Sequence, residues 1–299
     1  MSVAVGDKMS LSRPSGARTV KNGLASVYVY LAALLAIVPL VWVLYSVISK
    51  GYRLLMTSSW WFESQRGITP RREGGGAYHA IVGTVEIAVI CALIAVPLGI
   101  LGAIYLIEYA RGTKVARAIS FAVDILSGIP SIVAALFIYA LFITIFGFGR
   151  SVVAVSCALV LLMLPTVLRS TEEMLKLVPD SLREASYALG VPKWKTIFKV
   201  VIPTAFSGIS TGVVLGLARV MGETAPLLIL VSYGVGINFS PTSGVMGALP
   251  TMINSGRDQA VTMPGYERVW AAALTLILIV MALNLLARFI ARASRLKEK

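Results

Sequence analysis

Six long apolar segments constrain the fold of this 299-residue chain more than any other feature of its sequence. A helix needs about 20 mostly apolar residues to cross the hydrocarbon core of a bilayer. Because the chain is 57% hydrophobic and only 14% charged, little sequence remains for a soluble domain. The segments lie at residues 24–49, 80–107, 118–146, 151–168, 202–233 and 269–290. We predict an all-α, polytopic membrane protein with six transmembrane helices.

The distribution of Lys and Arg predicts the orientation of these helices. With the amino terminus in the cytoplasm, the cytoplasmic side carries four basic residues in a tail at 1–23, three at 108–117, six at 169–200 and five from Arg288 onward. The opposite side carries eight. Because short loops rich in Lys and Arg stay in the cytoplasm, we predict that both termini are cytoplasmic. The net charge of +13 follows this pattern, so the predicted partner is the lipid bilayer and not nucleic acid.

Several site types are missing from the sequence. It contains no G-x-x-x-x-G-K-[ST] loop, so any ATP must be bound by another polypeptide. Cys91 and Cys157 lie within apolar segments, where we expect them to pack as small apolar residues. His79 has no Cys or carboxylate at metal-ligand spacing and is expected at the membrane interface. We predict no metal site, no cofactor and no enzymatic activity in this chain.

A polar stretch after the fourth apolar segment predicts a helix–turn–helix elbow at residues 180–200. Asp180 or Ser181 is expected to cap the first helix, and Ser181 with Glu184 has the spacing of a capping box. Gly190 is expected to end this helix in the left-handed conformation. Pro192 suits the first turn of the second helix. The elbow is built as a docking surface.

Two other interpretations of the elbow are an amphipathic loop on the lipid headgroups and a DNA-binding helix-turn-helix. The DNA-binding interpretation fails on position, because the chain runs from Val200 through Pro203 into the next apolar segment without a linker.

Arg219 is the one cation buried within an apolar segment, away from the segment ends. A charge in mid-membrane costs about 2.5–3.5 kcal/mol on insertion scales, so it requires a reason. At 100° per residue, one narrow helical face carries Gly208, Gly212, Gly216, Arg219 and Glu223. Small residues at every fourth position allow close helix packing. Two interpretations stay open: a substrate path, in which Arg219 contacts an anion and is balanced by Glu223 or Glu86, or a structural ion pair.

The elbow resembles the EAA loop of ABC importer permeases. Ser186 stands where that family usually has a second alanine. A longer run at 183–228 and the stretch Gly128-Ile129-Pro130-Ser131 resemble PstA-type permease subunits of bacterial phosphate importers. The residues that match the EAA pattern are Glu184, Ala185, Ser186, Gly190, Val200, Ile202 and Pro203.

This resemblance implies a type I ABC importer permease fold, with a first transmembrane helix at 24–49 and a permease domain at 75–292 that contains a cytoplasmic coupling loop at 170–200. It implies a bacterial inner or plasma membrane permease for inorganic phosphate that forms half of the translocation path. The implied partners are a second, PstC-like permease, two ATP-binding PstB-like subunits that dock on the elbow, and an external PstS-like phosphate-binding protein. The alternatives are a permease for another oxyanion, such as sulfate or molybdate, and an ATP-independent channel or carrier.

Overall fold

The computed structural model describes residues 16–242, 244–257 and 263–296. Most of the predicted basic tail, residues 1–15, lies outside the described residues. The chain divides into two units, residues 1–49 and 50–299. In the first unit the described chain forms a single helix, α1 (Gly16–Leu55), which crosses the unit boundary and contains Pro39. This helix begins before residue 24, where the first span was predicted to start.

The described residues are helical and contain no β-strand, as predicted. Five helices within them are long and apolar enough to cross a membrane, or six if one bent pair counts as a single span. The five are Val20–Leu55, Tyr78–Tyr109, Val152–Lys176, Lys193–Gly222 and Met263–Phe289.

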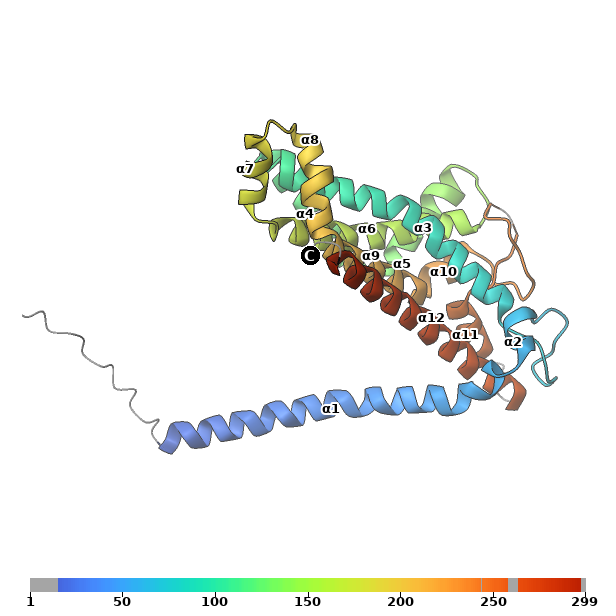
Figure 1. Ribbon diagram of the computed structural model, residues 1–299. Helices are drawn as coiled ribbons and strands as arrows, with labels where there is room; N and C mark the ends of the chain where they lie inside the picture. The colour runs from blue at the N-terminus through green and yellow to red at the C-terminus, as the bar shows by residue number, and fades with distance from the viewer. Residues whose placement is uncertain (1–15, 243, 258–262, 297–299) are drawn as a thin grey trace, which may run out of the picture. The chain divides into compact units, whose positions relative to one another are not determined.

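The second unit is a helical bundle centred on α6, which packs against α3 and α9, while α12 packs against α9 and α11 (Figure 1). Before the elbow, its elements are α2 (Ser58–Phe62), α3 (Tyr78–Ile104), the π-helix η1 (Tyr105–Tyr109), α4 (Lys114–Gly128), α5 (Ser131–Ile138), the π-helix η2 (Tyr139–Ile145) and α6 (Val152–Lys176). The elbow and the rest comprise α7 (Asp180–Ala188), α8 (Lys193–Thr196), the π-helix η3 (Ile197–Val201), α9 (Ile202–Gly222), α10 (Ala225–Leu230), α11 (Leu249–Arg257) and α12 (Met263–Leu296). Because α6 continues to Lys176, the first residues of the predicted 170–200 loop are helical.

The third predicted span, residues 118–146, is not one continuous helix. It consists of α4 and then α5 with η2, and the two parts are bent by 104°. At the break Ile129 has an extended backbone, with φ −71° and ψ 128°, and Pro130 precedes α5. A proline disfavours helical conformation in the preceding residue and removes a backbone donor. The predicted span is therefore broken at Ile129 and Pro130.

The fifth predicted span, residues 202–233, is also interrupted. α9 ends at Gly222, and Glu223 follows with an extended backbone, φ −70° and ψ 131°, before α10 begins. Pro226 explains the break, because it has no N–H to donate to the carbonyl of Gly222 four residues earlier. Glu223 is the C-cap of α9, so the predicted face ends with it, and its carboxylate stays near Arg219 one turn earlier.

Glycines bring α3 and α9 unusually close to α6. At four glycines, an added Cβ would lie at or inside van der Waals distance of an α6 side chain. The contacts pair Gly99 with Val167, Gly208 with Met174, Gly212 with Ser170 and Gly216 with Met163. The glycine face of α9 therefore packs against protein and not against lipid.

Two side chains at the end of the bundle opposite the elbow are buried inside the protein. Trp60 is fully buried, and its indole N–H donates to Thr275 Oγ1 at 2.9 Å. His79, which was expected at the membrane interface, is buried against Gly247. The connection between α10 and α12 contains the short helix α11.

Candidate functional site

The elbow forms as two short helices joined at Gly190. The φ of Gly190 is 73°, which confirms the predicted left-handed residue. Its amide N–H donates to the carbonyl of Tyr187 at 2.9 Å, and the amide of Val191 donates to the carbonyl of Ser186 at 3.2 Å. These bonds satisfy carbonyls that the end of α7 leaves free.

The predicted helix caps differ from those in the structure. Pro179 occupies the N-cap of α7, no side chain caps this helix, and the Ser181–Glu184 capping box does not form. The Asp180 carboxylate instead accepts from Arg183 at 3.0 Å. Pro192 is the N-cap of α8 and does not lie in its first turn.

A buried hydroxyl pair holds the two arms of the elbow together. Ser186 Oγ lies 2.8 Å from Thr196 Oγ1, and both side chains are buried. An alanine at position 186 would leave the Thr196 hydroxyl without this partner. Serine here therefore adds a specific contact as well as being small.

The outward surface of the elbow is partly apolar. Glu184 and Ala185 are exposed, and the side chains of Leu189 and Trp194 are 83% and 59% exposed. Large apolar side chains gathered on one exposed surface are typical of a protein contact. The elbow therefore has the character of a docking surface.

The second arm of the elbow continues directly into α9. The segment Lys193–Gly222 is one continuous helical span, in which α8 passes through η3 into α9. Ile197 and Val201 of η3 are buried, and Pro203 follows η3 inside this continuous helix, where it has no N–H to donate to the preceding turn. A displacement of the elbow is thereby carried into α9 through the main chain.

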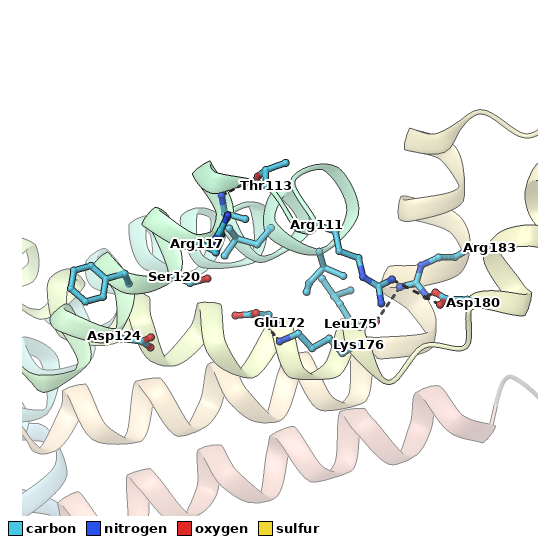
Figure 2. Close-up of a pocket in the computed structure, with 15 residues that line it drawn as sticks. Arg111, Thr113, Arg117, Ser120, Asp124, Glu172, Leu175, Lys176, Asp180 and Arg183 are labelled. Carbon is cyan, nitrogen blue, oxygen red and sulfur yellow. Dashed lines mark hydrogen bonds and ion pairs between the residues drawn. The ribbon is translucent and has the colours of Figure 1, made fainter.

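Ion pairs surround a cavity of about 460 Å³ beside the elbow, between the end of α3, α4, α6 and α7. Figure 2 shows Glu172 and Lys176 on one wall, and Asp180 and Arg183 at the elbow. Glu172 bonds Arg169 at 2.6 Å and Lys176 at 2.8 Å. Arg169 also reaches Asp124 on α4 at 2.6 Å. The Arg169–Asp124 pair links α6 to α4, and the two pairs of Glu172 lie within α6.

Sequence reasoning missed Glu108 and Arg183, which meet beside this cavity. Arg183 Nη2 lies 2.8 Å from Glu108 Oε1, and both side chains are almost fully buried. Glu108 is a carboxylate at the end of an apolar segment, which was a usable signal. Its partner lies 75 residues away, so no local pattern identified the pair.

The structure brings Arg219 near Glu223 but not to Glu86. Arg219 Nε lies 3.8 Å from Glu223 Oε1, too far for a hydrogen bond. The Arg219 side chain is 51% exposed in this chain, and that of Glu223 is 18% exposed. No ion pair joins Arg219 to Glu86 in the described residues. Of the predicted face, the three glycines contact α6, while Arg219 keeps an exposed guanidinium.

Residues 95–296 match the family described as "Binding-protein-dependent transport system inner membrane component". The chain belongs to this family. Members in other organisms are similar along most of their length. "Phosphate transport system permease protein PstA 1" of Mycobacterium tuberculosis (strain CDC 1551 / Oshkosh) is 50% identical over 284 residues, which cover 93% of this chain and 92% of that protein.

Two further PstA proteins extend this similarity within the binding-protein-dependent family. "Phosphate transport system permease protein PstA" of Mycobacterium leprae (strain TN) is 52% identical, covering 90% of this chain and 88% of that protein. The protein of the same name from Yersinia pestis is 37% identical, covering 91% of this chain and 90% of that protein.

Solved structures give the fold of this family member. A chain of the MetNI methionine ABC transporter in an inward-facing conformation matches with a TM-score of 0.55 and 21% identity, covering 73% of this chain and 94% of that chain. A chain of a bacterial alginate ABC transporter matches with a TM-score of 0.59 and 15% identity, covering 92% of this chain and 99% of that chain. The predicted type I ABC importer permease fold is confirmed.

The left-handed turn of the elbow generates a first test. Gly190→Val should strain the turn by roughly 1–2 kcal/mol, which corresponds to about 5- to 30-fold easier local opening. Amide hydrogen exchange in residues 180–200 of the purified protein should accelerate accordingly. Gly149→Val is the control, because Gly149 has no left-handed φ and nothing lies within 4 Å of its Cβ position. Unchanged exchange in the Gly190 variant would show that the turn does not depend on glycine.

Proposed function

We propose that this chain is the transmembrane permease subunit of an ATP-driven ABC importer for inorganic phosphate and forms half of the translocation path. The observation that carries the proposal is 50% identity, over 93% of the chain, to a protein named as a phosphate transport permease. The elbow supports it independently, because it offers an exposed partly apolar surface joined without a linker to α9. The chain itself carries out no chemical reaction.

The proposed partners follow from the surfaces and from what the sequence lacks. The sequence has no phosphate-binding loop for ATP, so two PstB-like subunits bind the nucleotide and dock on the elbow around Glu184, Ala185 and Gly190. A second, PstC-like permease completes the path, and an external PstS-like protein delivers phosphate. Closure of the ATP-binding subunits pulls the elbow, and the continuous helix from Lys193 to Gly222 passes this pull to α9.

The membrane orientation is part of the proposal. The excess of Lys and Arg in the tail, the elbow and the other predicted cytoplasmic loops supports an orientation with the elbow and both termini in the cytoplasm of a bacterial cell and the chain in the inner or plasma membrane. This side is the one on which ATP is available to the partner subunits.

Arg219 and Glu223 are the proposed substrate-path residues. A guanidinium presents a fork of donors that fits phosphate oxygens. The Arg219 guanidinium is half exposed and held only loosely by Glu223, so it is free to contact an anion. Glu223 limits how tightly an anion is held, as conduction requires. Glu86 on α3 is the alternative partner for Arg219 in another state of the transport cycle.

Purification of the tagged chain from its native membrane tests the assembly and its activity. An ATP-binding subunit and a second permease should be recovered with it. Vesicles that contain this complex and the external binding protein should accumulate phosphate only when ATP is present. Accumulation of sulfate or molybdate in place of phosphate would assign a different oxyanion, and uptake without ATP would favour a channel or carrier.

Cysteine labelling tests the orientation. In a Cys91→Ser, Cys157→Ser background, we expect Leu189→Cys in the elbow to be protected from an impermeant maleimide added to intact cells. Phe239→Cys, at the opposite end of the bundle, should react, since Phe239 is 67% exposed. The reverse labelling pattern would overturn the proposed topology.

Substitutions at Arg219 separate a substrate contact from a structural ion pair. Arg219→Lys should impair phosphate uptake, and Arg219→Ala should lower it at least about tenfold, because a hydrogen bond to a charged group contributes about 1.5–3 kcal/mol. Arg219→Gln should stay inactive when combined with Glu223→Gln. Each variant is matched for membrane abundance and assembly. Recovery of uptake in the double variant would leave Arg219 with a structural role only.

A further inference from the structure

Both arms of the elbow contact one residue at the end of α3. Arg183 of α7 donates to the Glu108 carboxylate from Nε at 3.1 Å and from Nη2 at 2.8 Å. Lys193, the first residue of α8, donates from Nζ to the Glu108 backbone carbonyl and lies over the neighbouring Tyr109 ring at 4.7 Å. Both arms of the elbow therefore bind Glu108, the first arm at its carboxylate and the second at its backbone carbonyl.

The ion pair between Glu108 and Arg183 is buried and difficult to separate. The two side chains are only 5% and 11% exposed. The remaining Arg183 donors bond the carbonyls of Val178 at 2.7 Å and Leu175 at 3.0 Å, and the exposed Asp180 carboxylate at 3.0 Å. Separation of a buried pair leaves an uncompensated charge, which is strongly unfavourable. Glu108 and Arg183 should therefore stay in contact while the elbow moves.

The ionic contact between the turn that follows η1 and the elbow is weak. Arg111 lies 3.9 Å from Asp180, and their side chains are 78% and 65% exposed (Figure 2). Exposed pairs of this kind contribute little, because water screens both charges. Of the two ionic contacts, the buried one is that of Glu108, and it adds to the apolar cluster that Ile104 and Leu106 share with Ile197 of the elbow.

Glu108 also lies at a special position along α3. It belongs to the π-helix η1 (Tyr105–Tyr109), which continues α3, and the neighbouring Leu106 is buried in the core. The elbow runs into α9 through another π-helix, η3. Insertions of this kind are often found at functional sites. The elbow is thus joined to α9 by the main chain, and to the end of the α3 span by the buried Glu108–Arg183 pair, by Lys193 and by a shared apolar cluster.

We propose that Glu108 is a positioning residue that ties α3 to the elbow, so that movement of the elbow displaces α3 together with α9. The inference rests on the proposed function, because it requires an ATP-binding subunit that moves the elbow. Without the pair, the elbow still docks and ATP is still hydrolysed, but α9 moves without α3. Hydrolysis then becomes uncoupled from transport.

The test compares Glu108→Gln, Arg183→Gln and their double variant in the complete reconstituted importer, with phosphate imported per ATP hydrolysed as the measured quantity. Each single variant should lower this ratio by about tenfold, within the range typical of coupling between sites. The double variant should lower it no further, because both changes remove the same interaction. The amount of ATP-binding subunit that co-purifies should not change.

Two variants keep this test independent of folding defects. Asp180→Asn removes the exposed carboxylate that contacts the same arginine and should leave the ratio unchanged. Lys193→Gln removes the bond from the second arm of the elbow to the Glu108 carbonyl, and Lys193 is exposed. This variant should lower the ratio moderately while the protein stays fully assembled.

Three results would overturn the inference: a wild-type ratio in Glu108→Gln and Lys193→Gln, a loss of the ATP-binding subunit from these variants, or single effects that multiply in the double variant. The first two leave the proposed function intact. If the wild-type complex itself imports no phosphate, the proposed function is wrong and the inference falls with it.

Discussion

The arrangement of the second unit depends on the close approach of α3 and α9 to the central helix α6. Within a bilayer, apolar side chains gain little from leaving lipid, so helices associate through close van der Waals packing. Glycines at Gly99 on α3 and at Gly208 and Gly212 on α9 allow this approach. In the apolar stretch of α6, 67% of the residues are buried, against 39% in the α3 span and 28% in the α9 span. α6 is therefore the central helix, and the others pack around it.

This packing fixes where the functional groups lie. α3 and α9 flank the same helix and both reach the elbow, α9 through η3 and α3 through η1. Arg219 lies near the other end of α9, so docking and the proposed anion contact belong to one rigid element. The ion pairs between α4 and α6, formed by Arg169 with Asp124 and Glu172, hold a further helix to the same centre.

Features governed by local sequence were predictable. The apolar segments, the left-handed Gly190 and the glycine face of α9 follow from length, backbone sterics and helical periodicity. The breaks at Pro130 and Pro226 were not predictable, since neighbouring groups in a membrane protein can satisfy the carbonyl that a proline frees. Whether a proline kinks or ends a helix then depends on tertiary packing.

Contacts between residues far apart in the sequence could not be predicted for a similar reason. The indole N–H of Trp60 donates to Thr275, which lies 215 residues away in the sequence, so no local pattern shows that Trp60 is buried. Glu108 and Arg183 are each ordinary charges at the edge of an apolar segment, and only the folded chain makes them a buried pair. The exposure of Arg219 depends equally on which helices surround the end of α9, and one helical face cannot specify that.

The 104° break between α4 and α5 also limits which surfaces of the bundle can touch hydrocarbon. Where a helix stops and restarts, several peptide N–H and C=O groups have no partner in the next turn. Acyl chains offer no hydrogen bonds, so such a corner is stable at membrane depth only against another polypeptide or in water. At membrane depth, the bend at Ile129 and Pro130 would therefore need a neighbouring polypeptide or water against it, which a single copy surrounded by lipid does not supply.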